Sequence, residues 1–174
     1  MSNIAGKAYA MNVLTPMPVR WTVINRLLFL LSRVWPSSLH RLLGLRLIHF
    51  ARWVVIERHQ WPAGDRGPQR LTHDYMLFCS NFNGTWDQYI DAFSDGIPSG
   101  LDLFWYTSIK YPASIPIPSF KNYIARNQVH TGYYYNAPPG PTQRETKAAP
   151  NVYAALEGLA ERHGGRTSVH EALN

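Results

Sequence analysis

The residues best suited to chemistry in this chain lie on two apolar segments that predict strands. His49 and Arg52 stand in the segment HFARWVV, and Asn81 stands in YMLFCSNFN. An imidazole can act as a base or as a haem ligand, and a guanidinium with an amide can orient a polar substrate. Side chains three residues apart on a strand point to opposite faces, so His49 and Arg52 should not share one site. We take His49, Arg52 and Asn81 as catalytic candidates; the alternative for His49 is a core residue bonded to a carbonyl.

A further polar group follows the second of these strands. Asn83 shares a strand face with Asn81, and Asp87 comes about one helical turn later. Polar side chains at a sheet edge can orient a small ligand, but they also serve turns and helix caps. Asp87 and Asp91 lie four residues apart on one helix face, so either is also a candidate to pair with Arg52. Asn83 and Asp87 are therefore ligand-binding candidates, with a structural role as the alternative.

Aromatic side chains add two more ligand-binding candidates, Trp105 and Tyr134. Such rings can line an apolar cavity, although rings in a sheet more often form its core. Cys79 has no histidine close to it in the sequence, and we expect an inert buried thiol. The histidines show no H-x-H or H-x-x-x-H spacing, so we expect no metal site.

Positive charge is concentrated in the first third of the chain. Seven lysine and arginine residues precede Glu57, the first acidic residue, while the whole chain has a net charge of +6. Residues 19–35 predict an apolar helix with a narrow polar stripe, typical of a helix lying in anionic lipid headgroups. The alternative is a helix buried against a neighbouring subunit. Basic residues interleaved with bulky aliphatics, without a reader motif, do not favour nucleic acid. The candidates for membrane or partner contact are Arg20, Trp21, Arg26, Arg33 and Trp35.

Length and composition favour one domain with a helical tail. The chain has 174 residues, of which 45% are hydrophobic, and a single cysteine. Proline and glycine at 138–141 separate a domain at 1–141 from a tail at 142–174, where a helix is predicted at 152–163 behind a Thr142–Glu145 capping box. No secretion signal or membrane span is evident, so we expect a cytoplasmic protein, with the inner face of the membrane as a site of peripheral contact.

The order of predicted elements indicates a ferredoxin-like α+β fold. Strands at 8–15, 46–58, 75–83 and 129–137 alternate with the helix at 19–35 and a helix that begins at a Thr85–Gln88 capping box; 101–111 fits either a helix or a strand. This is the split βαβ order, in which a four-stranded antiparallel sheet has its helices on one face. Two strands are apolar on both sides. The helix-free face should therefore also be covered, most simply by a second copy of the sheet.

Three stretches resemble the dimeric α/β-barrel superfamily: LIHFARWVVIE, YMLFCSNFNGTWDQYIDAF and GYYYNAPPG. They are most similar to a branch that pairs an HFARWVV strand with an LLFxSNFDG strand. The resemblance implies a homodimer. The superfamily includes cofactor-free monooxygenases of the antibiotic-biosynthesis type, chlorite dismutases and dye-decolourising haem peroxidases, as well as domains without known chemistry.

Two functions follow as hypotheses. The first is a domain that binds a hydrophobic small molecule or lipid and is either peripheral to the membrane or an accessory subunit of a larger complex. The alternative is an oxidoreductase of the superfamily, haem-dependent or cofactor-free, with His49 as ligand or base. The resemblance admits haem, but the residues do not favour it, and the cofactor is left open.

Overall fold

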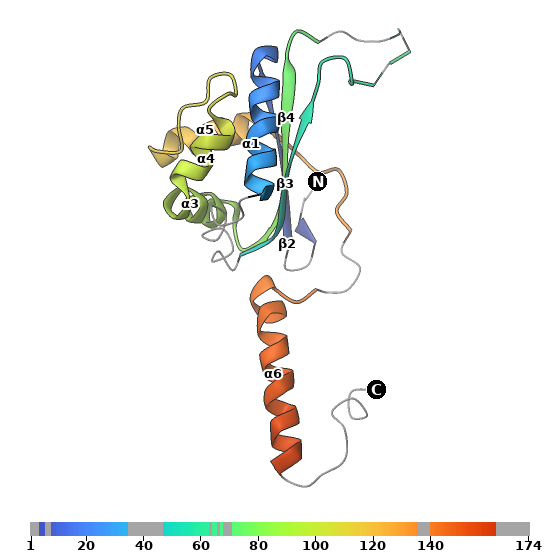
Figure 1. The fold of residues 1–174 in the computed structure, drawn as a ribbon, viewed down its shortest axis with the longest axis vertical. Helices are drawn as coiled ribbons and strands as arrows, with labels where there is room; N and C mark the ends of the chain where they lie inside the picture. The colour runs from blue at the N-terminus through green and yellow to red at the C-terminus, as the bar shows by residue number, and fades with distance from the viewer. Residues whose placement is uncertain are drawn as a thin grey trace.

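An antiparallel sheet with helices on one of its faces forms the body of the protein (Figure 1). The computed structural model describes residues 4–5, 8–34, 47–62, 64–65, 67, 71–135 and 140–162. The strands are β1 (Ile4–Ala5), β2 (Ala8–Met17), β3 (Ile48–Ile56), β4 (Asp74–Asn83) and β5 (Gln128–Val129). They run in the order β1-β2-β4-β3, and the short β5 pairs with β2.

The helices separate into a group on the sheet and one that extends away from it. They are η1 (Val19–Trp21), α1 (Thr22–Val34), α3 (Trp86–Gly96), α4 (Pro98–Trp105), α5 (Ile117–Asn127) and α6 (Gln143–Arg162). Figure 1 shows α1, α3, α4 and α5 on one side of the sheet and α6 projecting from the body. Residues 101–111 form the end of α4 and the turn after it. The predicted fold class is confirmed, while pairing of the sheet with a second copy stays a prediction.

The core lies between the sheet and the helices packed on it. Alternate side chains of β2 and β4 point toward the helices, which is why Met11 and Phe78 are buried. Tyr89 of α3 stacks on Phe82 with 3.8 Å between ring centroids, and its hydroxyl lies 2.7 Å from Ser80 Oγ. Burial raises the pKa of Tyr89 above its ordinary value. The hydroxyl is therefore a neutral donor within an aromatic core.

Two helices begin at the capping boxes predicted from the sequence. Before α3, the Gln88 backbone N–H donates to Thr85 Oγ1 at 3.2 Å, and the Thr85 N–H donates to Gln88 Oε1 at 3.1 Å. Before α6, Thr142 and Glu145 form the same reciprocal pair. The predicted tail helix at 152–163 is therefore too short, because α6 begins at Gln143, directly after Thr142.

The last predicted strand, 129–137, is wrong. Of its described residues, only those in β5 pair with the sheet, and the chain then crosses the helix-free face (Figure 1). Side chains hold it there: Asn12 Nδ2 donates to Thr131 Oγ1 at 2.8 Å, and Asn81 Nδ2 donates to the Tyr134 hydroxyl. Three consecutive tyrosines, 133–135, favour a strand by their β propensity, and only the middle one packs on the sheet, while the backbone leaves the ladder.

The helix-free face carries both apolar and polar side chains. On β3, Phe50 and Val54 are 54% and 40% exposed, and Arg52 is exposed between them. In register on β4, Leu77 lies opposite Val54, and Cys79 lies opposite Arg52. The crossing segment covers part of β2 and β4, so the exposed apolar part of this face belongs chiefly to β3.

Candidate functional site

Polar side chains attach α1 to the sheet. Thr22 is buried, and its hydroxyl donates to the carboxylate of Asp74, which is 2% exposed. The backbone N–H of Arg58 donates to the other Asp74 oxygen at 2.8 Å. The fully buried Asn25 donates from its amide to Thr107 Oγ1 at 2.6 Å. Leaving such a buried group unsatisfied costs about 1–3 kcal/mol, so these bonds determine which side of α1 faces the sheet.

The opposite side of α1 is apolar and exposed. Its side chains range from 37% exposed at Ile24 to 72% exposed at Val34. They recur at helical spacing and therefore form one surface. This surface, the α1 apolar face, consists of Val23, Ile24, Leu27, Leu30, Leu31 and Val34. The inward side carries Phe29, which packs on Phe104 with 5.6 Å between ring centroids, beside the polar Thr22 and Asn25. The helix therefore buries only part of its apolar surface and leaves the larger part exposed.

Cationic side chains accompany the α1 apolar face. Arg26 forms an ion pair with Glu57, which follows β3. Arg33 is exposed in the last turn of α1 and has no acidic partner among the residues that the structure describes. The segment from η1 through α1 contains no acidic residue. The helix therefore presents apolar side chains and positive charge together.

The two tryptophans predicted near the ends of this helix have different outcomes. Trp21 packs edge-on against Tyr106 with 5.6 Å between ring centroids, and the guanidinium of Arg20 lies 5.9 Å from the Trp21 centroid. Trp35 lies outside the described residues. Arg20 and Trp21 thus form a partly exposed cation and ring at the start of the helix.

The three catalytic candidates do not meet in one enclosed site. Arg52 and Asn81 share the helix-free face, since Arg52 lies opposite Cys79, two residues from Asn81 along β4. His49 is exposed at an irregularity of β3, where the pairing register shifts. The predicted pairing of Arg52 with an aspartate of α3 is wrong, because α3 packs on the other face of the sheet. The oxidoreductase alternative stays a prediction.

Two of the ligand-binding candidates have structural partners. Asp87 and Asp91 each lie 2.8 Å from Lys121 Nζ, and their hydrogen bonds raise the pKa of Lys121. Asn83 Oδ1 accepts from the backbone N–H of Gln143 at 2.9 Å. The aspartates thus connect α3 to α5, and Asn83 connects the end of β4 to the start of α6.

Trp105 and Tyr134 lie on different faces of the sheet. Trp105 is 1% exposed on the helix side, edge-on to Phe78 at 4.9 Å and 5.9 Å from Trp53 between ring centroids. Tyr134 is half-buried on the helix-free side, where its hydroxyl accepts from Asn81. The two rings therefore do not line a common cavity.

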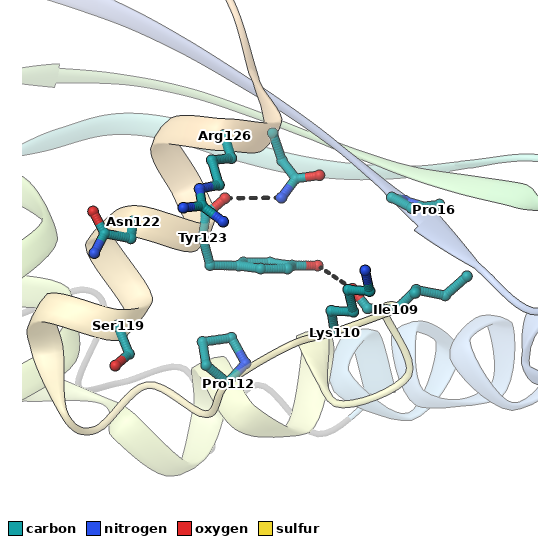
Figure 2. Close-up of a pocket in the computed structure, with 9 residues that line it drawn as sticks. Pro16, Ile109, Lys110, Pro112, Ser119, Asn122, Tyr123 and Arg126 are labelled. Carbon is teal, nitrogen blue, oxygen red and sulfur yellow. Dashed lines mark hydrogen bonds between the residues drawn. The ribbon is translucent and has the colours of Figure 1, made fainter.

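A pocket of about 540 Å³ that no motif predicts opens between α5 and the loop at 106–116 (Figure 2). The Tyr123 hydroxyl donates to the Ile109 carbonyl at 3.3 Å, and Asn127 Nδ2 donates to the Tyr123 carbonyl at 2.8 Å. Figure 2 shows Lys110 and Arg126 on either side of the Tyr123 ring. Burial raises the pKa of Tyr123 to about 12. The lining residues come from three separate stretches of the chain, so a local sequence pattern cannot find them.

Within the described ranges, no group of three or more histidine, cysteine or carboxylate side chains is arranged to hold a metal ion. None of the helices among the described residues has the length and apolar character needed to cross a bilayer. Comparison of the chain with protein-family models, with curated proteins and with solved structures found no match.

Proposed function

We propose that the protein binds peripherally to an anionic membrane surface, with α1 lying in the lipid headgroup region. The observation that carries this proposal is the α1 apolar face, which is exposed although polar hydrogen bonds hold the other side of the helix to the sheet. A helix in the headgroup region places its apolar side among acyl chains and its cations among phosphates. That is the distribution of side chains on α1.

Charge favours lipid over a second copy of α1 as the occupant of this face. Pairing two α1 helices about a two-fold axis would bring the cations of one copy, among them Arg33 without an acidic partner in the described residues, near those of the other, and like charges would repel. An anionic bilayer attracts the same side chains, at about 1 kcal/mol for each cation near its surface. Full burial of a leucine adds about 2 kcal/mol. Charge attraction and leucine burial therefore both favour binding on a lipid surface, whereas in a pair of α1 helices the charges oppose it.

Reversing one charge on α1 should weaken binding to anionic vesicles. Arg33→Glu removes an attraction and adds a repulsion of similar size, so we expect a loss of about 2 kcal/mol, or roughly thirtyfold in the partition coefficient. Flotation of the full chain with vesicles containing phosphatidylserine measures it. Vesicles of phosphatidylcholine alone should bind both forms weakly.

Arg144→Glu is the matched control for this experiment. Arg144 is also exposed, but it lies in the first turns of α6. The variant has the same net charge as Arg33→Glu, so a general charge effect would reduce binding equally in both. Equal losses, or wild-type binding that does not depend on anionic lipid, would contradict the proposal.

A second candidate function, self-association through the helix-free face, rests on a separate observation. Phe50 and Val54 are largely exposed on β3, and Leu77 lies beside Val54 on β4. Two such faces in contact would give the dimeric α/β barrel that the sequence resembles. Arg52 lies between the apolar residues, and its long side chain can extend to the rim of such an interface. The α1 apolar face lies on the helix side of the sheet and would stay free for lipid.

Introducing a charge on this face should dissociate such a dimer. Val54→Glu would place like charges close to the two-fold axis, and we expect a cost of about 3 kcal/mol to association. Light scattering on the eluate of a gel-filtration column should show a dimer for the wild type and a monomer for the variant at micromolar concentration. If the wild type is monomeric at this concentration, it does not self-associate with micromolar affinity, and this second candidate function is wrong.

A further inference from the structure

We propose that the pocket beside Tyr123 binds a small organic phosphate monoester. Lys110 and Arg126 line this pocket, and none of the described residues that line it is acidic. Neither cation has an ion-pair partner in the part of the chain that the structure describes, whereas Arg26 and Lys121 elsewhere are paired. Two uncompensated cations match the charge of about −2 that a phosphate monoester carries near neutral pH.

Neutral donors complete the polar side of the pocket. Ser119, Asn122 and Arg126 are spaced three and four residues apart and therefore share one face of α5. All three line the pocket, and Figure 2 shows them projecting from α5. A phosphate accepts hydrogen bonds on several oxygens, and an arginine can bind two of them at once. A hydroxyl, an amide and a guanidinium on one helix face suit such a group.

The loop that carries Lys110 is held in place before any ligand arrives. The Ile109 backbone N–H donates to the carbonyl of Pro16 at 2.8 Å, and the Ile109 carbonyl accepts from the Tyr123 hydroxyl. Lys110 itself has φ 59°, a left-handed conformation that L-residues other than asparagine and aspartate seldom adopt. The surrounding bonds maintain this conformation, and Figure 2 shows the Lys110 amine beside the hydroxyl end of the Tyr123 ring. A loop whose backbone is already held in place loses less entropy when a ligand binds.

The rest of the lining indicates that the phosphate belongs to an organic molecule. Pro16, Ile109 and Pro112 form the apolar side of the pocket. The volume of about 540 Å³ falls in the usual range of small-molecule sites, which is roughly 300–1,000 Å³, and exceeds what a bare phosphate fills. An aromatic or short aliphatic phosphate monoester would place its organic part against these walls.

Titration calorimetry of the full chain with phenyl phosphate tests the proposal, with inorganic phosphate as the comparison. We expect phenyl phosphate to bind more tightly, because only its ring contacts the apolar walls. The double variant Lys110→Met with Arg126→Met should raise the dissociation constant at least about tenfold. Both residues are exposed, so the thermal unfolding midpoint of this variant should stay close to that of the wild type.

Lys121→Met is the matched control, because Lys121 lies on the same helix but its charge is directed to Asp87 and Asp91. It should bind phenyl phosphate as the wild type does. The proposal is overturned if the wild type does not bind phenyl phosphate, or if the double variant and the control bind it equally.

Flotation with vesicles containing phosphatidic acid identifies the source of the phosphate group. A double variant that floats as the wild type does assigns the pocket to a soluble phosphate monoester. One that loses flotation, while Lys121→Met retains it, assigns the pocket to a lipid headgroup. Since the calorimetric measurement contains no membrane, failure of phenyl phosphate binding is distinguishable from failure of membrane binding through α1.

Discussion

Replacement of Leu27 and Leu30 by glutamine is expected to weaken binding of the protein to anionic vesicles about thirtyfold. Both leucines belong to the α1 apolar face and are 52% and 55% exposed in the free protein. Fully burying a leucine side chain contributes about 2 kcal/mol, and about half of each of these side chains remains to be buried, so losing two costs about 2 kcal/mol, roughly thirtyfold in the partition coefficient. The bound fraction in flotation at a fixed lipid concentration measures the loss.

This substitution should leave the fold intact, so a loss of flotation would report on membrane binding and not on unfolding. Glutamine and leucine have similar helix propensities, and neither leucine contributes to the core. The thermal unfolding midpoint should therefore change little. The matched control is Val152→Gln with Leu156→Gln on α6, where the two side chains are 56% and 46% exposed. If the α6 pair weakens flotation and the α1 pair does not, membrane binding belongs to α6 and the proposal for α1 is wrong.

The apolar character of α1 is predictable from its sequence, but its orientation is not. The pattern at 19–35 shows leucines almost all round with a narrow polar stripe, and such a pattern allows either side to face a sheet. The structure buries Thr22 and Asn25 because Asp74 and Thr107 bond to them. These partners are 52 and 82 residues away along the chain. Hydrogen bonds over such separations leave no local sequence signal.

In the rest of the fold, too, features set by local sequence patterns are predictable, and features set by contacts between distant residues are not. The long strands and the capping boxes follow from spacing over a few residues, and both are confirmed. The path of the chain after β5 depends on Asn12 and Asn81, which hold it by side-chain bonds from distant strands. The pocket cations, Lys110 and Arg126, escape prediction for the same reason. Neither stands in a motif, and only packing of α5 on the preceding loop brings them together.

Trp105 could belong to a ligand cavity or to the core on sequence grounds, and the structure places it in the core. Truncating Trp105 to alanine is therefore expected to lower the free energy of unfolding by about 4 kcal/mol. The ring is 1% exposed and packs against Phe78, Trp53 and Phe120, so its loss removes apolar burial and leaves a cavity. Domains are typically stable by about 5–15 kcal/mol, so the loss is a large fraction of the total. Urea unfolding followed by circular dichroism measures it.

Two further variants test whether lost packing of the Trp105 ring causes the expected loss of stability. Trp105→Phe keeps a ring and removes the indole N–H, which is buried without a hydrogen-bond partner among the described residues, so it should cost about half as much as the alanine variant. Tyr133→Ala removes a ring that is 81% exposed and should change stability by no more than about 0.5 kcal/mol. If Trp105→Ala unfolds at the same urea concentration as the wild type, the ring contributes no packing energy. The ligand-binding role expected from the sequence would then be the better account of a large aromatic residue at this position.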